Sequence, residues 1–202
     1  RLINRLLRNP KSEIFINIMA DSINRFIEQP DDTITKHIVE LFGTNEVLNV
    51  INGIGDRVKQ LRAVYQHQLS TCAKFVRYFE MHDENNRLIY YLFFATNNRL
   101  GHARMKEAMW KIDSQTGFTY SDATNPDQLT LFTLDPSPNI CLILIEKFQS
   151  QTVLMSQLIV CIDDETPYIS SQLRKALKEL EENGKICVEP CKSTGEKRRK
   201  NA

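Results

Sequence analysis

The sequence predicts an α/β domain followed by a winged helix-turn-helix. Near the start, an apolar run over residues 12–19 precedes an amphipathic segment over residues 20–29, which is the strand-then-helix order of α/β proteins. Near the end, residues 152–189 read as an apolar helix, an acidic turn at 163–167 and a second amphipathic helix. A short β-branched stretch then follows, as in the wing of a winged helix.

The composition is that of an ordinary globular protein. The 202 residues are 42% hydrophobic and 25% charged. No apolar run approaches the roughly 18 residues needed to cross a bilayer, and no basic-apolar leader is visible. Five scattered cysteines fit a reducing compartment, so we expect a cytoplasmic protein with no membrane partner. Because residues 1–9 resemble the end of a helix, we expect this chain to be the C-terminal part of a longer protein.

Helices are predicted between the first strand and a later hairpin. After the segment at 20–29, a turn caps a helix over 34–41, and a short helix covers 46–51. Asp56 caps a longer helix that ends near residue 72. The predicted core positions of this longer helix share one face: Val58, Leu61, Val64, Tyr65 and Leu69.

A β-hairpin is the clearest strand signal. Residues 74–81 alternate apolar and polar side chains, and residues 87–96 return as a nearly continuous apolar strand. A helix follows over 101–111. Strand, helices and a hairpin with an antiparallel last strand are how the C-terminal half of a Rossmann-like sheet ends. We therefore assign residues 1–122 to the C-terminal part of a Rossmann-like α/β domain and 123–138 to a linker.

The remaining residues predict the winged helix, over 139–191, and a basic tail, over 192–202. Asn183 and Gly184 form a left-handed stop signal for the second helix, and residues 185–188 are expected to form the wing strand. Apolar side chains at helical spacing define the inner face of that helix: Leu173, Ala176, Leu177 and Leu180.

Five segments of the predicted α/β domain carry a family resemblance: 13–27, 40–44, 74–81, 90–113 and 117–122. Through these segments, residues 14–122 resemble the three-Cys-motif partner protein family of bacteria and mobile elements. The resemblance implies a methyltransferase-like α/β body, a winged-helix C-terminus and a radical-SAM-like partner protein in a phage-related or defence setting. In such proteins the S-adenosylmethionine-binding loop precedes the segment that matches Glu13. No residue of this chain is therefore assigned to methyl-donor binding or to catalysis, and the resemblance leaves enzymatic activity undecided.

Candidate nucleic-acid contacts lie on the second helix and in the tail. Between residues 174 and 200 there are nine Lys or Arg against five Glu. Serines and basic side chains can hold phosphates, and Gln or Arg can read base edges. The partner favoured is duplex DNA, although Glu179, Glu181 and Glu182 also leave protein docking, oligomerisation or a structural role open. The candidates are Ser170, Ser171, Gln172, Arg174, Lys175, Lys178, Lys192, Lys197, Arg198, Arg199 and Lys200.

Two further candidates are anion sites in the α/β domain. Arg99 and His102 follow the strand at 87–96, and Arg25 lies in the helix after the first strand. The alternatives are a structural turn for Arg99 and His102, and an ion pair within the fold for Arg25. Trp110 is expected in a core rather than stacked on a base. Cys187 and Cys191 lack further ligands nearby, so no metal site is predicted.

Overall fold

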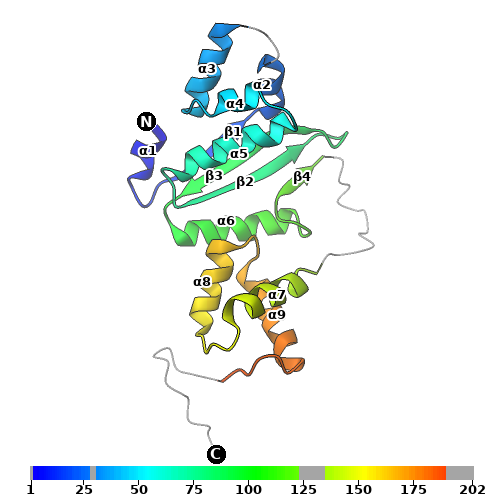
Figure 1. Cartoon of the computed structure of the whole chain (residues 1–202). Coiled ribbons are helices and arrows are strands. Elements are labelled where there is room, and N and C mark those ends of the chain that lie inside the picture. The colour runs from blue at the N-terminus through cyan, green and yellow to red at the C-terminus, as the bar shows by residue number, and fades with distance from the viewer. Residues whose placement is uncertain (1, 28–30, 123–134, 190–202) are drawn as a thin grey trace, which may run out of the picture. The chain divides into compact units, whose positions relative to one another are not determined.

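The computed structural model describes residues 2–27, 31–122 and 135–189, and the chain divides into two compact units, Arg1–Leu131 and Phe132–Ala202 (Figure 1). Each unit is described by itself. None of the helices in these described ranges is long and apolar enough to cross a membrane.

The first unit contains a four-stranded sheet with the order β1-β3-β2-β4. Its strands are β1 (Glu13–Ile18), β2 (Phe75–His82), β3 (Leu88–Thr96) and β4 (Thr119–Ser121). The strand β3 runs antiparallel to both β1 and β2, whereas β4 runs parallel to β2. The most apolar strand is therefore central, which explains its continuous run of hydrophobic side chains. The hairpin and the first strand are confirmed, and β4 is an addition that the sequence did not indicate.

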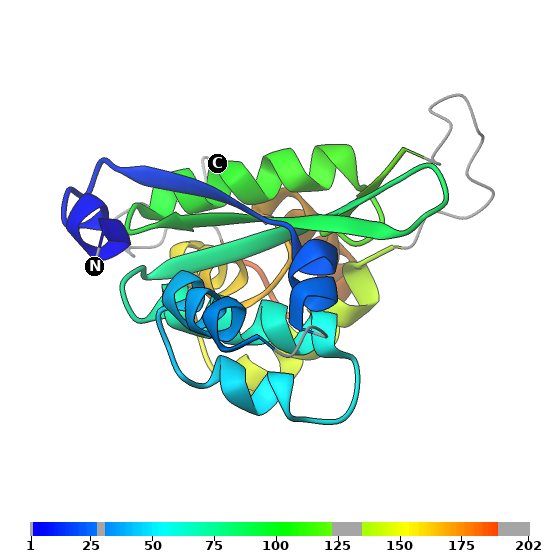
Figure 2. The same ribbon diagram turned by 90° about the horizontal axis from the view of Figure 1, so that it is seen from above.

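Helices cover both faces of this sheet (Figures 1 and 2). Four predicted helices between β1 and β2 are confirmed, and so is the helix after β3. The short helix α1 packs Leu7 against residues of β1 and β3, on the face of the sheet that is also covered by the four helices between β1 and β2. The bounds are α1 (Leu2–Leu7), α2 (Ala20–Ile27), α3 (Asp32–Phe42), α4 (Val47–Ile51), α5 (Arg57–Ser70) and, on the opposite face, α6 (Arg99–Ile112).

Aromatic side chains fill the core between α5 and the sheet. The Tyr65 ring lies 5.1 Å from the Phe93 ring and 5.4 Å from the Phe42 ring, measured between centroids. Burial raises the pKa of Tyr91 to about 12. Leu61, Tyr65 and Leu69 are buried as the helical spacing predicts.

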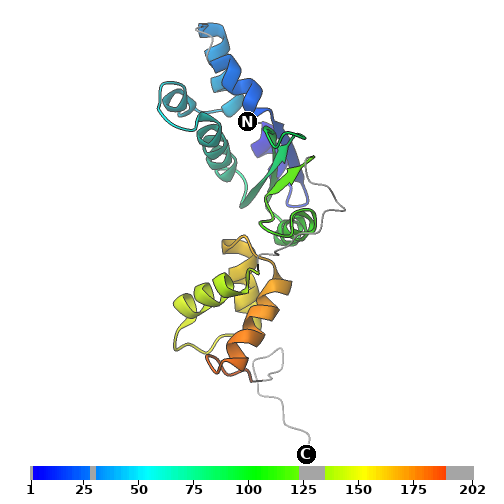
Figure 3. The same ribbon diagram turned by 90° about the vertical axis from the view of Figure 1, so that its right-hand side faces the viewer.

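The described part of the second unit, residues 135–189, is a cluster of three helices, α7 (Ser137–Phe148), α8 (Met155–Glu165) and α9 (Ser170–Glu182). Figure 3 shows these helices packed together. All three helices contribute buried side chains to one hydrophobic core. These side chains are Ile140, Leu144, Leu158, Ile162, Leu173, Ala176 and Leu180. Gly184 ends α9 with φ of 65°, and the amide of Lys185 donates to the carbonyl of Leu180 at 2.9 Å. This is the predicted left-handed stop signal.

Three local expectations for the second unit are wrong. Asp163, Asp164 and Glu165 form the last turn of α8 rather than a separate turn. Residues 185–188 do not form a regular strand in the described part of the chain, because no neighbouring strand is there to pair with them. The helix α7 begins at Ser137, inside the predicted linker.

Candidate nucleic-acid interface

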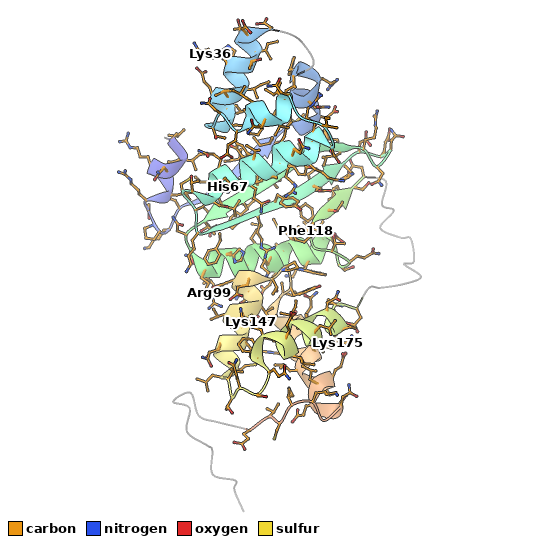
Figure 4. The ribbon with its side chains drawn as sticks, viewed as in Figure 1. Lys36, His67, Arg99, Phe118, Lys147 and Lys175 are labelled. Atoms are coloured by element: carbon orange, nitrogen blue, oxygen red, sulfur yellow. The ribbon has the colours of Figure 1, made fainter. Side chains whose placement is uncertain are left out.

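The helix α9 separates apolar from basic side chains. Leu173, Ala176 and Leu180 are buried in the three-helix core. Leu177 packs against the same core, and because α-helical residues recur every 3.6 positions, the remaining positions lie on the other side of the helix. The side chains left exposed include four predicted contacts: Ser171, Arg174, Lys175 and Lys178. Figure 4 shows Lys175 projecting from α9, and Lys147 from α7.

Ser170 and Gln172 have structural contacts at the start of α9. The Ser170 hydroxyl donates to Asp163 Oδ1 at 3.0 Å, which ties α9 to the end of α8. Gln172 Oε1 accepts the Ile169 amide at 3.0 Å, which satisfies a donor at the helix N-terminus. The Ser170 hydroxyl hydrogen and Gln172 Oε1 are thus used in hydrogen bonds at the junction between α8 and α9. The side-chain amide nitrogen of Gln172 can still donate to another partner.

Lys175 forms an ion pair with Asp135, which lies just before α7. Asp135 also accepts the Ser137 amide at 3.0 Å. The bond from Lys175, followed by the bond from Ser137, lowers the pKa of the Asp135 carboxyl from 3.8 to about 2. The same bond raises the pKa of Lys175. A phosphate approaching Lys175 would therefore compete with a carboxylate already in place.

Lys178 and Arg174 differ in their surroundings. Lys178 Nζ lies 3.6 Å from Glu182 Oε1 in the next turn, and both side chains are largely exposed. Exposed pairs of this kind contribute little, so Lys178 is easily released to another anion. Arg174 is exposed as well, and within the described ranges it has no acidic partner.

The charge of the folded second unit is unexpectedly acidic. Residues 135–189 contain five basic side chains (147, 174, 175, 178 and 185) against nine acidic ones (135, 146, 163, 164, 165, 179, 181, 182 and 189). The predicted tail contacts lie outside the described residues: Lys192, Lys197, Arg198, Arg199 and Lys200. The positive face of α9 is therefore local, and the positive charge that balances the acidic side chains of residues 135–189 is in the tail, with five basic side chains and one acidic one.

Arg25 makes contacts within its own helix. Its guanidinium lies 3.4 Å from Asp21 Oδ2 and 3.4 Å from the Ser22 hydroxyl oxygen, both one turn earlier on the exposed face of α2. This is the ion pair that the sequence left as the alternative to phosphate binding.

The turn before Arg99 and His102 is held by its two asparagines. Asn97 Oδ1 accepts the Lys74 amide at 2.7 Å, and Asn97 Nδ2 donates to the Leu7 carbonyl at 2.9 Å. Asn98 Oδ1 accepts the amide of Leu100 at 2.9 Å and caps α6. These bonds support the structural alternative for this turn.

The His102 ring is occupied by its neighbours in the sheet. It stacks on Phe75 with centroids 4.4 Å apart, and its Nε2 accepts Arg77 Nε at 2.9 Å. Because β3 is antiparallel to β1, the carboxyl end of β3, which precedes His102, and the carboxyl end of β1, which precedes Arg25, lie at opposite ends of the strand pair. The two candidate anion sites are therefore not one site.

Trp110 is packed within the first unit, as expected. A Cβ at Gly117 would lie 2.8 Å from its indole ring, and Gly117 has φ of 73°. The glycine thus permits both the left-handed turn and the close approach of the chain to the ring. The sequence signal for this contact is the lone glycine that closes the turn after α6.

The described residues do not supply a nucleotide-binding loop or a metal centre. The chain passes from β1 into α2 through Met19 alone, without the glycines that let a backbone approach phosphates. Within the described ranges, no three His, Cys, Asp or Glu side chains gather in a way that could hold a metal ion. No step through S-adenosylmethionine is therefore assigned to these residues.

A comparison with family models supports the assignment of a winged helix to the second unit. A model described as the GMT-like wHTH domain matches residues 119–193, which include α7, α8 and α9. Searches of curated proteins and of solved structures returned no match. The chain thus carries a winged helix-turn-helix region at its C-terminal side, after a mixed α/β unit with a four-stranded sheet.

Proposed function

We propose that this chain is a cytoplasmic nucleic-acid-binding component of a mobile-element or phage-defence system, and that α9 contacts duplex DNA. The observation that carries the proposal is the outward face of α9. Arg174, Lys175 and Lys178 are exposed on a helix whose opposite face is locked into the winged-helix core. A helix held in this way can enter a major groove without rearranging its own domain.

Binding exchanges ion pairs that exist in the free protein. Phosphates replace Asp135 at Lys175 and Glu182 at Lys178, while Arg174 meets the nucleic acid directly. Each exchange releases condensed counterions from the duplex, so affinity falls as salt rises. The tail residues from Lys192 to Lys200 add the positive charge that the folded unit does not have.

The α/β unit is proposed as a methyltransferase-like body. The support is the sheet order, in which β3 is inserted antiparallel between the parallel strands β1 and β2. In this proposal the chain is part of an S-adenosylmethionine-dependent nucleic-acid methyltransferase whose donor site is formed by residues outside it. Docking of a radical-SAM-like partner protein is the second candidate, and the exposed apolar residues Leu142 and Ile145 of α7 favour it.

Duplex binding by the full chain tests the proposal. Fluorescence anisotropy with a labelled duplex should show binding that weakens steeply between about 50 and 200 mM salt. Replacing Arg174, Lys175 and Lys178 together with Ala should lower the affinity about tenfold or more. A matched control replaces three exposed lysines of the first unit, Lys11, Lys36 and Lys59, and should have little effect.

Two results would overturn the proposal. One is the absence of duplex binding at low salt by protein whose circular dichroism shows the expected helices. The other is an equal loss of affinity in the α9 variant and in the lysine control, since that would be a general charge effect. Single-stranded RNA of the same length, used as a competitor, separates duplex recognition from general polyanion binding.

A further inference from the structure

The orientation of the Gln172 side-chain amide is fixed by the backbone at the start of α9. The Ile169 amide is a hydrogen-bond donor, so only the oxygen of the Gln172 amide group can face it, and Oε1 accepts this bond at 3.0 Å. The side chain is half-buried as well. The other end of this planar group, Nε2 with its two hydrogens, is therefore directed away from the Ile169 amide.

This orientation changes which bases Gln172 can recognise. An unrestrained glutamine recognises adenine with two bonds, because its oxygen accepts from N6 while its nitrogen donates to N7. That contact needs the oxygen and the nitrogen to face the same base edge. In α9 the oxygen faces the backbone of the helix itself, and turning it towards a base would leave the Ile169 amide without this acceptor. Gln172 therefore presents hydrogen-bond donors to a ligand.

The side chains around Gln172 in the first half of α9 are mainly donors too. Residues 170–178 contain three basic side chains, one glutamine and two serines, and no acidic residue. Arg174 and Lys175 are exposed and carry donors only. Ser170 is turned towards α8, where its hydroxyl donates to Asp163. The first turns of the second helix are the part of a helix-turn-helix that contacts base edges, so a base in front of α9 meets mostly donors.

Among the four bases, guanine has the edge that best matches donors. In the major groove, guanine presents two adjacent acceptors, N7 and O6, whereas thymine presents one acceptor, O4. Adenine carries the N6 donor beside its N7 acceptor, and cytosine presents the N4 donor. A side chain held as a donor therefore gains most from guanine, and it meets another donor at cytosine.

We infer that Gln172 selects guanine in the duplex that α9 contacts, as a specificity-determining residue held in one orientation by the Ile169 amide. This role rests on the proposed function, because α9 must lie in a major groove for Gln172 to meet a base. It goes further than that function, since contacts to phosphates alone carry no sequence preference. Gln172 lies one turn before Lys175, so a phosphate bound by the lysine would hold the glutamine in register with the bases.

Selection of bound duplexes from a library with random central base pairs, using the full chain, tests this role. The wild type should recover a site with guanine at one position, favoured over cytosine there by about fivefold or more. Gln172→Glu keeps an oxygen for the Ile169 amide and puts a second oxygen in place of Nε2, so it should favour cytosine, whose N4 donates. The other positions of the site should stay the same, and they identify the strand that is read.

Two further variants complete the test. Gln172→Ala removes the donors and should lose the preference for guanine at this position. Gln157→Glu makes the matched change at the start of α8, where Gln157 Oε1 accepts the Leu154 amide at 2.8 Å, and it should recover the wild-type site. Circular dichroism of each variant reports whether the helices are retained.

Duplex binding by the wild type without a base preference would overturn the role of Gln172 and leave the proposed function in place. Recovery of one and the same site by the wild type, Gln172→Glu and Gln172→Ala would do so too, because another residue would then read the guanine. A wild-type protein that binds no duplex at low salt would instead overturn the proposed function, and the role of Gln172 with it.

Discussion

Each of the two lysines at the centre of the α9 face has a carboxylate partner in the free protein. Lys175 is paired with Asp135 across the unit, and Lys178 is paired with Glu182 along its own helix. Carboxylates near a phosphate-binding lysine reduce its affinity for phosphate. The phosphate must first displace the carboxylate from the lysine, and the displaced carboxylate then repels the phosphate. Under the proposed function, we therefore expect Asp135 to limit nucleic-acid binding, while its ion pair with Lys175 holds the chain before α7 against α9.

Replacing Asp135 with Asn should increase duplex affinity about two- to fivefold, the range expected for an exposed ion pair. The variant loses the carboxylate that competes for Lys175, yet keeps an oxygen for the Ser137 amide. Anisotropy at low and high salt measures the change. Asp32→Asn, an exposed acid in α3, is the matched control and should bind like the wild type. An unchanged or weaker affinity for the Asp135 variant would contradict the prediction.

The same variant changes acid stability in a defined direction. The pKa of Asp135 is about 2 in the folded protein, below the ordinary value of 3.8. Its contribution to stability is thus fully present above about pH 4 and is lost as the pH falls towards 2. Acid unfolding of the wild-type second unit should include this loss, whereas the Asn variant should lack it.

At the scale of elements, α8 and α9 begin with the same capping hydrogen bond. Gln157 Oε1 accepts the Leu154 amide at 2.8 Å, as Gln172 Oε1 accepts the Ile169 amide. Leu154 and Ile169 cannot cap a helix with their own side chains, so a glutamine three residues later satisfies a free amide at each start. Both helices of the helix-turn-helix therefore depend on a glutamine for a fixed first turn.

Gln172→Ala should lower the free energy of unfolding of the second unit by about 0.5–1.5 kcal/mol, because a helix-terminal amide loses its partner. Gln172→Glu should be close to wild type, since its carboxylate still accepts the bond and favours the positive end of the helix. Urea unfolding followed by circular dichroism measures both. Equal destabilisation by the two variants would show that shape, rather than the accepted hydrogen bond, determines stability at this position.

Local signals predicted most of these elements. Asp31 and Asp56 cap α3 and α5, and Gly184 ends α9, because each effect involves residues a few positions apart. The exposed face of α9 follows from helical periodicity alone. The pair between Asp135 and Lys175 joins residues distant in sequence, so no local pattern could reveal it. The wing strand at 185–188 was expected from β-branched residues, but a strand requires a neighbour as well as a propensity.

At the scale of the whole molecule, the placement of charge sets the order in which binding determinants act. The net charge of the chain is +1, and the described part of the second unit has more acidic than basic residues. Long-range attraction to a duplex therefore cannot come from the folded winged helix. Under the proposed function, we expect this attraction to come from the tail, and we expect Arg174, Lys175 and Lys178 to act over short distances once the helix is in a groove.

Removal of residues 190–202 should separate these two contributions. The truncated protein loses five basic side chains, so the slope of log affinity against log salt should become shallower by up to about 4.5 if every basic side chain of the tail meets a phosphate. The melting temperature should not change, because the described helices and the buried core that they share are formed by residues before 190. The Ala variant of Arg174, Lys175 and Lys178 should reduce the slope by no more than about 3. If truncation left both affinity and slope unchanged, α9 would have to attract the duplex against the acidity of its own unit, and the division between long-range and short-range determinants would be wrong.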